Sequence, residues 1–200
     1  MSIPCRVLFS NDTTNTLTCV SPFHAAGEPF RPEMLAATVD EVAGTGVDVH
    51  VLQPGFSWVP WYNSRFYTRE EHRTWFEQRF PDKSSYELND YWVNGGDLVG
   101  EFVAHCRQKR QPRFISMRLN HNPFPGREEQ TSSRFFDQHP EYYIGDEPYW
   151  TLDWSFEAVR EHRFTQIREI CEQYDLDGFE LDFMRFPIYF EPERTASAER

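Results

Sequence analysis

The residues best placed to do chemistry lie in a short run near the carboxyl end of the chain, from Gly178 to Arg185. Its alternating polar and apolar residues predict a β-strand, in which successive side chains point to opposite faces. Glu180 and Asp182 therefore share one face with Met184, and the Cα atoms of the two acidic residues are expected about 6.6 Å apart. Two carboxyl groups at this spacing are suited to acid and base catalysis. The alternative is a buried ion pair that stabilises the fold.

A second predicted strand, residues 113–120, presents another set of polar side chains. Alternation puts Arg118 and Asn120 on the same face. We expect Arg118 to face the acidic pair. His121 follows directly, and an imidazole at this position could transfer protons, bind a metal or have neither role.

These strands are part of a regular alternation of strands and helices along the chain. Because parallel strands require crossovers of a dozen or more residues, and helices supply them here, the pattern predicts an α/β fold with a parallel sheet. The predicted strands are residues 6–10, 47–53, 113–120 and 178–185, and the predicted helices are 32–43, 96–107 and 155–174.

The connections between these elements differ in length at the two ends of the strands. Residues 56–94 and 121–152 follow strands and are long and aromatic, whereas the returns from helix to strand are short. In a (β/α)8 barrel the segments after the strands build the active site. We therefore predict one partial barrel domain over residues 1–200, with 56–94 and 121–152 as substrate-side loops. Only the first four β/α units are expected, because a full barrel needs roughly 250 residues.

Composition narrows the class of protein further. The formal net charge of −12 disfavours nucleic-acid binding. Neither a signal peptide nor an apolar run long enough to span a membrane is visible, so the sequence as written predicts a cytoplasmic protein; secretion remains open if the N-terminus is incomplete. The four cysteines are scattered without a C-x-x-C pair, which suggests neither a zinc site nor a disulfide framework; they are Cys5, Cys19, Cys106 and Cys171.

The segment from Tyr174 to Pro187 reads Y-D-L-D-G-F-E-L-D-F-M-R-F-P. It resembles the Y-x-x-D-G-x-x-L-D-[YF]-x-R-[YF]-P signature of the family-ten-like glycosyl hydrolases. Weaker likenesses span most of the chain; they are Trp58-Val-Pro-Trp61, Ile115 to Asn120, and Leu152-Asp-Trp-Ser155 leading into Val159-Arg160. The resemblance implies a barrel that hydrolyses carbohydrates without a cofactor, with Asp182 at the signature aspartate and Arg185 at the signature arginine.

Aromatic residues after the second predicted strand suit such a substrate. Sugar C–H faces stack on aromatic rings, so Trp58, Trp61 and Tyr62 are candidate substrate-binding residues, together with Arg118, Asn120, His121 and Arg185. The alternative is that the aromatics fold the long segment onto the barrel, and this is the favoured reading for Phe66, Trp75 and Phe76.

The sequence thus predicts a glycoside hydrolase whose catalytic candidates are Asp182 and Glu180, acting on an oligosaccharide or polysaccharide. Two alternatives stay open. Glu180, Asp182 and His121 could instead bind a divalent metal in an isomerase or hydrolase barrel. The chain could also be a non-catalytic, carbohydrate-binding barrel fragment. The sequence carries no signal for the oligomeric state.

Overall fold

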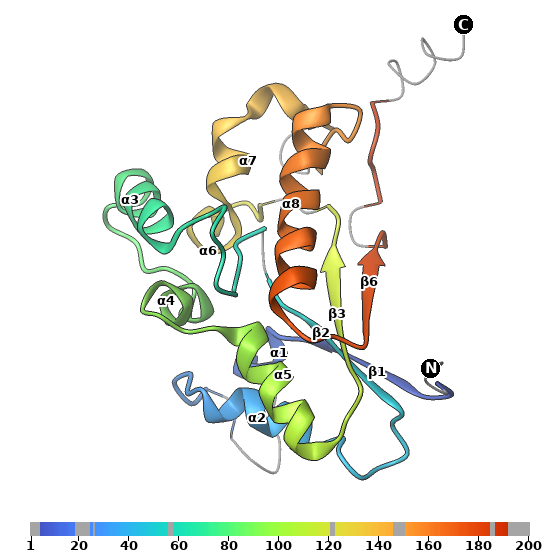
Figure 1. Ribbon diagram of the computed structural model, residues 1–200. Coiled ribbons are helices and arrows are strands. Elements are labelled where there is room, and N and C mark those ends of the chain that lie inside the picture. Colours follow the sequence, from blue (N-terminus) through green and yellow to red (C-terminus); the bar gives the residue numbers. More distant parts are fainter. Residues whose placement is uncertain are drawn as a thin grey trace, which may run out of the picture.

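The computed structural model describes residues 5–18, 25, 27–55, 58–120, 123–145, 151–184 and 187–191. Figure 1 shows the arrangement of the elements. The strands are β1 (Leu8–Asp12), β2 (Val49–Gln53), β3 (Arg113–Arg118), β4 (Tyr143–Ile144), β5 (Thr151–Leu152) and β6 (Gly178–Asp182). The helices are α1 (Asn15–Thr18), α2 (Glu33–Asp40), α3 (Arg69–Arg79), α4 (Glu87–Val93), α5 (Leu98–Lys109), α6 (Glu128–Thr131), α7 (Arg134–Gln138) and α8 (Glu157–Gln173), with a 3-10 turn at Pro140–Tyr142.

Four strands form one parallel sheet in the order β1-β2-β3-β6. All four strands and the three crossover helices predicted from the sequence are present, with ends that differ by a few residues. Each new strand adds to the same side of the previous one, as in barrels; a doubly wound sheet reverses this direction once. The α/β prediction is therefore confirmed. The described strands form an open sheet, so a closed eight-stranded barrel stays a prediction.

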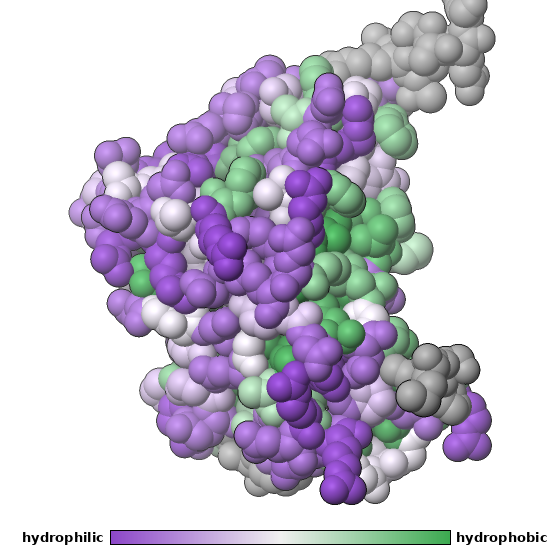
Figure 2. Space-filling view, in the orientation of Figure 1, coloured by the Kyte–Doolittle hydropathy of each residue, from purple (hydrophilic) through white to green (hydrophobic). Residues whose placement is uncertain are grey.

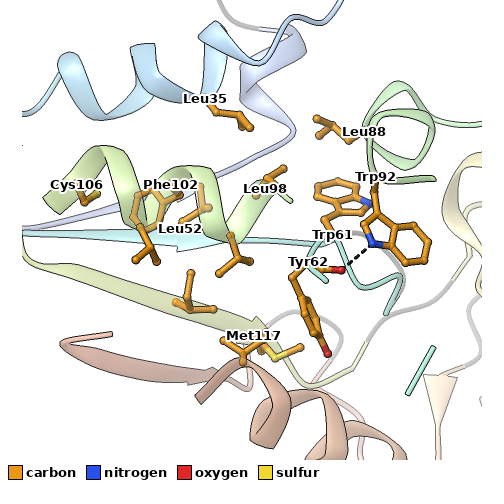
Figure 3. Packing of buried hydrophobic residues seen from close by; sticks show 14 of the residues in the cluster. Leu35, Leu52, Trp61, Tyr62, Leu88, Trp92, Leu98, Phe102, Cys106 and Met117 are labelled. Carbon is orange, nitrogen blue, oxygen red and sulfur yellow. Dashed lines mark hydrogen bonds between the residues drawn. The ribbon is translucent and has the colours of Figure 1, made fainter. Parts of the chain in front are cut away.

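One face of the sheet is covered by α2, α5 and α8 (Figure 1). Leu52, Ile115 and Phe179 are neighbours across β2, β3 and β6 and pack into the core beneath these helices. Figure 3 shows Leu35 of α2 and Leu98 and Phe102 of α5 in the same core. Because side chains alternate along a strand, the remaining residues of these strands point to the opposite face.

The long segments after β2 and β3 are helical in part instead of irregular. Helix α3 begins with a capping box, in which the Thr68 side chain accepts from the Glu71 backbone N–H and the Glu71 carboxylate accepts from the Thr68 backbone N–H. This S/T-x-x-E pattern is a helix-start signal, although residues 56–94 were predicted to be a loop. Helices α4, α6 and α7 and the small β4–β5 sheet occupy the rest of these segments.

The two outer strands of the sheet, β1 and β6, carry exposed apolar side chains. Leu8 lies on β1 and Leu181 on β6, and Phe183 and Met184 follow β6 directly. In Figure 2 hydrophobic residues gather along the right side of the molecule, where β6 lies in Figure 1. Within the described part of the chain, no helix has the length and apolarity required to cross a membrane.

Candidate functional site

Three charged side chains meet at the carboxyl end of the parallel sheet. Arg118 is the last residue of β3, and Asp182, the last residue of β6, is its register partner. The Arg118 Nε lies 3.8 Å from the Asp182 Oδ2. The Arg118 Nη2 also donates to Asp12 Oδ2 at the end of β1, at 2.6 Å. Strands β1, β3 and β6 thus bring two carboxylates to one guanidinium.

The Asp12 carboxylate is well stabilised in its ionised form. Burial by itself would raise the pKa of this carboxyl, but the charge and hydrogen bond of Arg118 and the hydrogen bonds from Thr14 together outweigh burial. The hydroxyl and backbone N–H of Thr14 both donate to Asp12 Oδ1, at 2.8 and 3.1 Å. The net result is a pKa below the ordinary aspartate value, so Asp12 carries a full negative charge at neutral pH.

Asp182 is partly exposed, and backbone N–H groups near the ends of β6 and β3 hold it in place. Its Oδ1 accepts from the Met184 backbone N–H at 2.8 Å, while its carbonyl accepts from the Leu119 N–H at 3.0 Å. These bonds orient the carboxylate beside Arg118. The prediction that Arg118 lies beside this acidic residue is therefore confirmed.

Glu180 lies one step earlier on β6, on the same face as Asp182, because Phe179 between Gly178 and Glu180 points into the helix-covered core. Its side chain is exposed, and its register partner on β3 is Ser116. Both predicted catalytic carboxyl groups thus lie on the face of the sheet that the helices leave uncovered.

A buried arginine supports the end of β3 from behind. Arg163 of α8 donates from Nη2 to the Arg118 carbonyl, and from Nη1 to Gln166 Oε1 at 2.6 Å. Gln166 in turn donates to the Trp58 carbonyl at 2.8 Å. Hydrogen bonds from α8 therefore connect the segment after β2 to the strand that carries Arg118.

Several predicted substrate-binding residues occupy structural positions instead. The exposed fractions of Trp61 and Tyr62 are 0% and 1%, and both belong to the core in Figure 3. The Trp61 indole donates to Asn89 Oδ1 at 2.6 Å, and the Tyr62 carbonyl accepts from the Trp92 indole at 2.7 Å. With their ring faces covered by protein, these two side chains have no surface on which a sugar could stack.

Asn120 is also fully buried and joins segments of the chain. Its side-chain nitrogen donates to the carbonyls of Leu152, at 3.2 Å, and Ile188, at 2.7 Å. Its side-chain oxygen accepts from the Leu152 N–H at 3.2 Å. We conclude that Asn120 holds the end of β3 to β5 and to the segment after β6.

Two further predicted residues, His121 and Arg185, lie outside the described residues. Among the residues that the structure does describe, no group of three His, Cys, Asp or Glu side chains is arranged to hold a metal ion. The metal-binding alternative required His121 as one ligand, and because His121 lies outside the described residues, that alternative stays a prediction.

Asp12 was not among the site residues predicted from the sequence. The predicted first strand ended at Ser10, whereas β1 continues through Asn11 and Asp12 and pairs with β2 up to Gln53. The available signal was position: an acidic residue directly after a strand-like run lies at the carboxyl edge of a parallel sheet, where sites form. This signal could have placed Asp12 among the candidates.

The fold and site define an α/β protein with a singly wound parallel sheet and an acidic cluster at its carboxyl edge. No protein-family model matches the chain, and no curated protein sequence matches it. Similar solved structures include a maltogenic α-amylase from Thermotoga neapolitana, at 14% identity over 88% of this chain and 38% of that one, with a TM-score of 0.48. Another is an α-galactosidase from Thermus thermophilus, at 14% identity over 92% and 31%, with a TM-score of 0.47. The chain spans about a third of the length of these two proteins.

Proposed function

We propose that this chain carries the catalytic strand of a glycoside hydrolase, related to the family-ten-like glycosyl hydrolases, with Asp182 as a catalytic carboxylate. The observation that carries the proposal is the pair of carboxylates, Asp12 and Asp182, on one Arg118 at the carboxyl edge of a parallel sheet. Hydrolysis of a glycosidic bond usually uses two carboxyl groups on either side of the scissile bond. The carboxyl edge is where α/β enzymes bind their substrates.

The roles of the three acidic residues follow from their surroundings. Asp182 lies beside Arg118 with part of its carboxylate exposed, so it can reach a glycosidic oxygen or an anomeric carbon. Asp12 is held ionised by Arg118 and in turn holds the guanidinium that lies beside Asp182. Glu180 is exposed on the same face and supplies a second carboxyl group or a bond to a sugar hydroxyl.

A non-catalytic, carbohydrate-binding role is the second candidate. It is favoured by the position of Glu180 and Asp182 on β6, an outer strand whose far edge is unpaired among the described strands. In that case the carboxylates would bind hydroxyl groups without cleaving the glycan. The two functions differ in one measurable quantity, which is turnover.

Turnover is tested by incubating the chain with 4-nitrophenyl glycosides and neutral oligosaccharides and measuring released nitrophenol and reducing ends. We expect hydrolysis of at least one substrate, and a decrease of roughly 10²- to 10⁴-fold in kcat for Asp182→Asn. Glu180→Gln should have a smaller effect. The matched control is Glu172→Gln, which removes an exposed carboxylate of α8 and should leave kcat unchanged.

Far-UV circular dichroism verifies that each variant remains folded. Asp182→Asn with wild-type turnover would exclude Asp182 as a catalytic residue. Binding without turnover in the wild-type chain would favour the carbohydrate-binding role, and the absence of both would end the proposal.

A further inference from the structure

A pocket lies among the segments that follow the carboxyl ends of the strands, apart from the acidic cluster. Its volume is about 130 Å³. The walls come from the segment after β2, from α7 and from the first turns of α8; they include Trp58, Phe66, Phe135, Gln138, His139 and His162. An engineered cavity of about 150 Å³ accepts benzene, so this pocket has the size of a single six-membered ring.

The inner walls of the pocket are ring faces. The His162 imidazole stacks on Phe135 with 3.9 Å between ring centroids, and on Trp58 with 5.7 Å. Phe66 meets the edge of His162 at 4.9 Å and is 42% exposed, so the pocket opens to solvent beside this ring. A ring-shaped ligand in the pocket would contact the exposed part of Phe66.

The backbone of Trp58, whose side chain is buried behind this wall, is strained. Its φ is +62°, a left-handed conformation that is an outlier for a bulky residue. The Gln166 side chain holds the Trp58 carbonyl, and the Arg163 guanidinium lies 5.0 Å over the indole ring. Such strain persists only where surrounding contacts enforce it, and it gathers at functional sites.

The polar groups of the pocket include an imidazole that is neutral at physiological pH. The His162 imidazole brings two ring nitrogens to the pocket. Burial, aided by the charges of Arg163 and Arg134, lowers the pKa of His162 to about 3. A neutral imidazole offers one donor and one acceptor, which suits hydroxyl groups. Arg134 forms an ion pair with Glu71 at 3.2 Å and lies over the Tyr67 ring.

We propose that this pocket is an accessory subsite that binds one pyranose unit of a neutral glycan, with the sugar ring against Phe66 and Phe135 and its hydroxyl groups on His162. The choice of a sugar rests on the proposed function. Hydrogen bonds through Gln166 and Arg163 connect the Trp58 carbonyl behind the pocket wall to the Arg118 carbonyl at the end of β3.

The test titrates neutral hexasaccharides of α-1,4-glucose, β-1,4-glucose, β-1,4-mannose and β-1,4-galactose into the full chain carrying Asp182→Asn. Tryptophan fluorescence and the NMR signal of the His162 ring C–H report binding. We expect at least one hexasaccharide to saturate the signal, and Phe66→Ala and His162→Phe each to weaken its binding about fivefold. His162→Phe keeps a ring in the wall and removes only the nitrogens.

The matched control is Phe164→Ala, which removes a ring of α8 that is 51% exposed and does not line the pocket. Binding that is unchanged in both pocket variants, or lost equally in the control, would overturn the subsite, as would the absence of binding by all four sugars. If the wild-type chain hydrolyses a glycan but the pocket substitutions do not change binding, the proposed function stands and the subsite is refuted. If a sugar binds in the pocket but the wild-type chain hydrolyses nothing, the subsite stands and the proposed catalytic function is refuted.

Discussion

The Arg118 guanidinium, at the end of β3, donates to the Asp12 carboxylate at the end of β1, with 2.6 Å between Nη2 and Oδ2. Strand β2 lies between these two strands in the sheet, so the arginine side chain reaches past it. Its Nε remains 3.8 Å from Asp182 on the other side. One cation therefore lies beside two carboxylates that are 170 residues apart in the sequence.

Arg118→Met is expected to destabilise the fold. The substitution leaves the half-buried Asp12 carboxylate without its cation, which costs about 2 kcal/mol; removal of a fully buried partner would cost more. Urea unfolding followed by circular dichroism measures the change in the free energy of unfolding. Arg107→Met is the control, because the Arg107–Asp175 ion pair is exposed and should contribute less than about 0.5 kcal/mol. Equal losses in the two variants would contradict this account.

His50 is expected to make the stability of the fold depend on pH. This residue of β2 is fully buried between Phe9 and Phe102, with ring centroids 5.3 and 5.0 Å away. Neither ring nitrogen has a hydrogen-bond partner among the described residues, and burial lowers the pKa of His50 to about 4. In the unfolded chain its pKa is near 6.5, so between pH 6.5 and pH 4 the unfolded state binds the proton and the folded state does not.

The free energy of unfolding therefore falls as the pH drops through this window. Because the pKa of His50 falls from near 6.5 in the unfolded chain to about 4 in the folded one, His50 lowers the free energy of unfolding by about 3 kcal/mol near pH 4. Urea unfolding at several pH values should show a shallower pH dependence for His50→Phe than for the wild type. His72 and His162 also have lowered pKa values and remain in both proteins, so the difference isolates His50. Parallel curves for the two proteins would disprove the assignment.

Gly178 begins β6 because a side chain does not fit there. A Cβ added to this residue would lie 2.3 Å from the Phe114 ring on the neighbouring strand β3. Gly178→Ala should therefore force the ring aside and cost about 1–3 kcal/mol, as overpacked sites do. Gly46→Ala is the control, since its added Cβ meets no atom within 4 Å.

The mechanism behind the Gly178 effect is tested by a double-mutant cycle with Phe114→Ala. Once the ring is removed, Gly178→Ala should cost far less than in the wild type, because the clash no longer exists. Additive costs would show that the loss comes from another source, such as the backbone conformation of the strand.

Thr68→Ala should loosen the helix that follows β2. The Thr68 side chain accepts from the Glu71 N–H, and its loss leaves that first-turn donor without its cap. We expect a decrease of about 1 kcal/mol in the free energy of unfolding and faster amide hydrogen exchange confined to α3. Thr74→Ala, a change within α3 that removes no cap, should have little effect. Unchanged exchange in Thr68→Ala would show that packing alone defines the start of this helix.

The sequence by itself determined the α/β plan, the four parallel strands and the meeting of Arg118 with Asp182. These features follow from local periodicity and from the rule that the carboxyl ends of parallel strands lie at one edge. The tertiary structure alone decided that Asp12 joins them, because its position depends on the order and register of three strands. It also decided that Trp61 and Tyr62 are fully buried core residues, whereas Trp58, at 5% exposure, packs beneath Phe135 and His162 at the inner wall of a pocket. Aromatic residues pack and bind through the same ring faces, so only the neighbours that cover each ring distinguish the two roles.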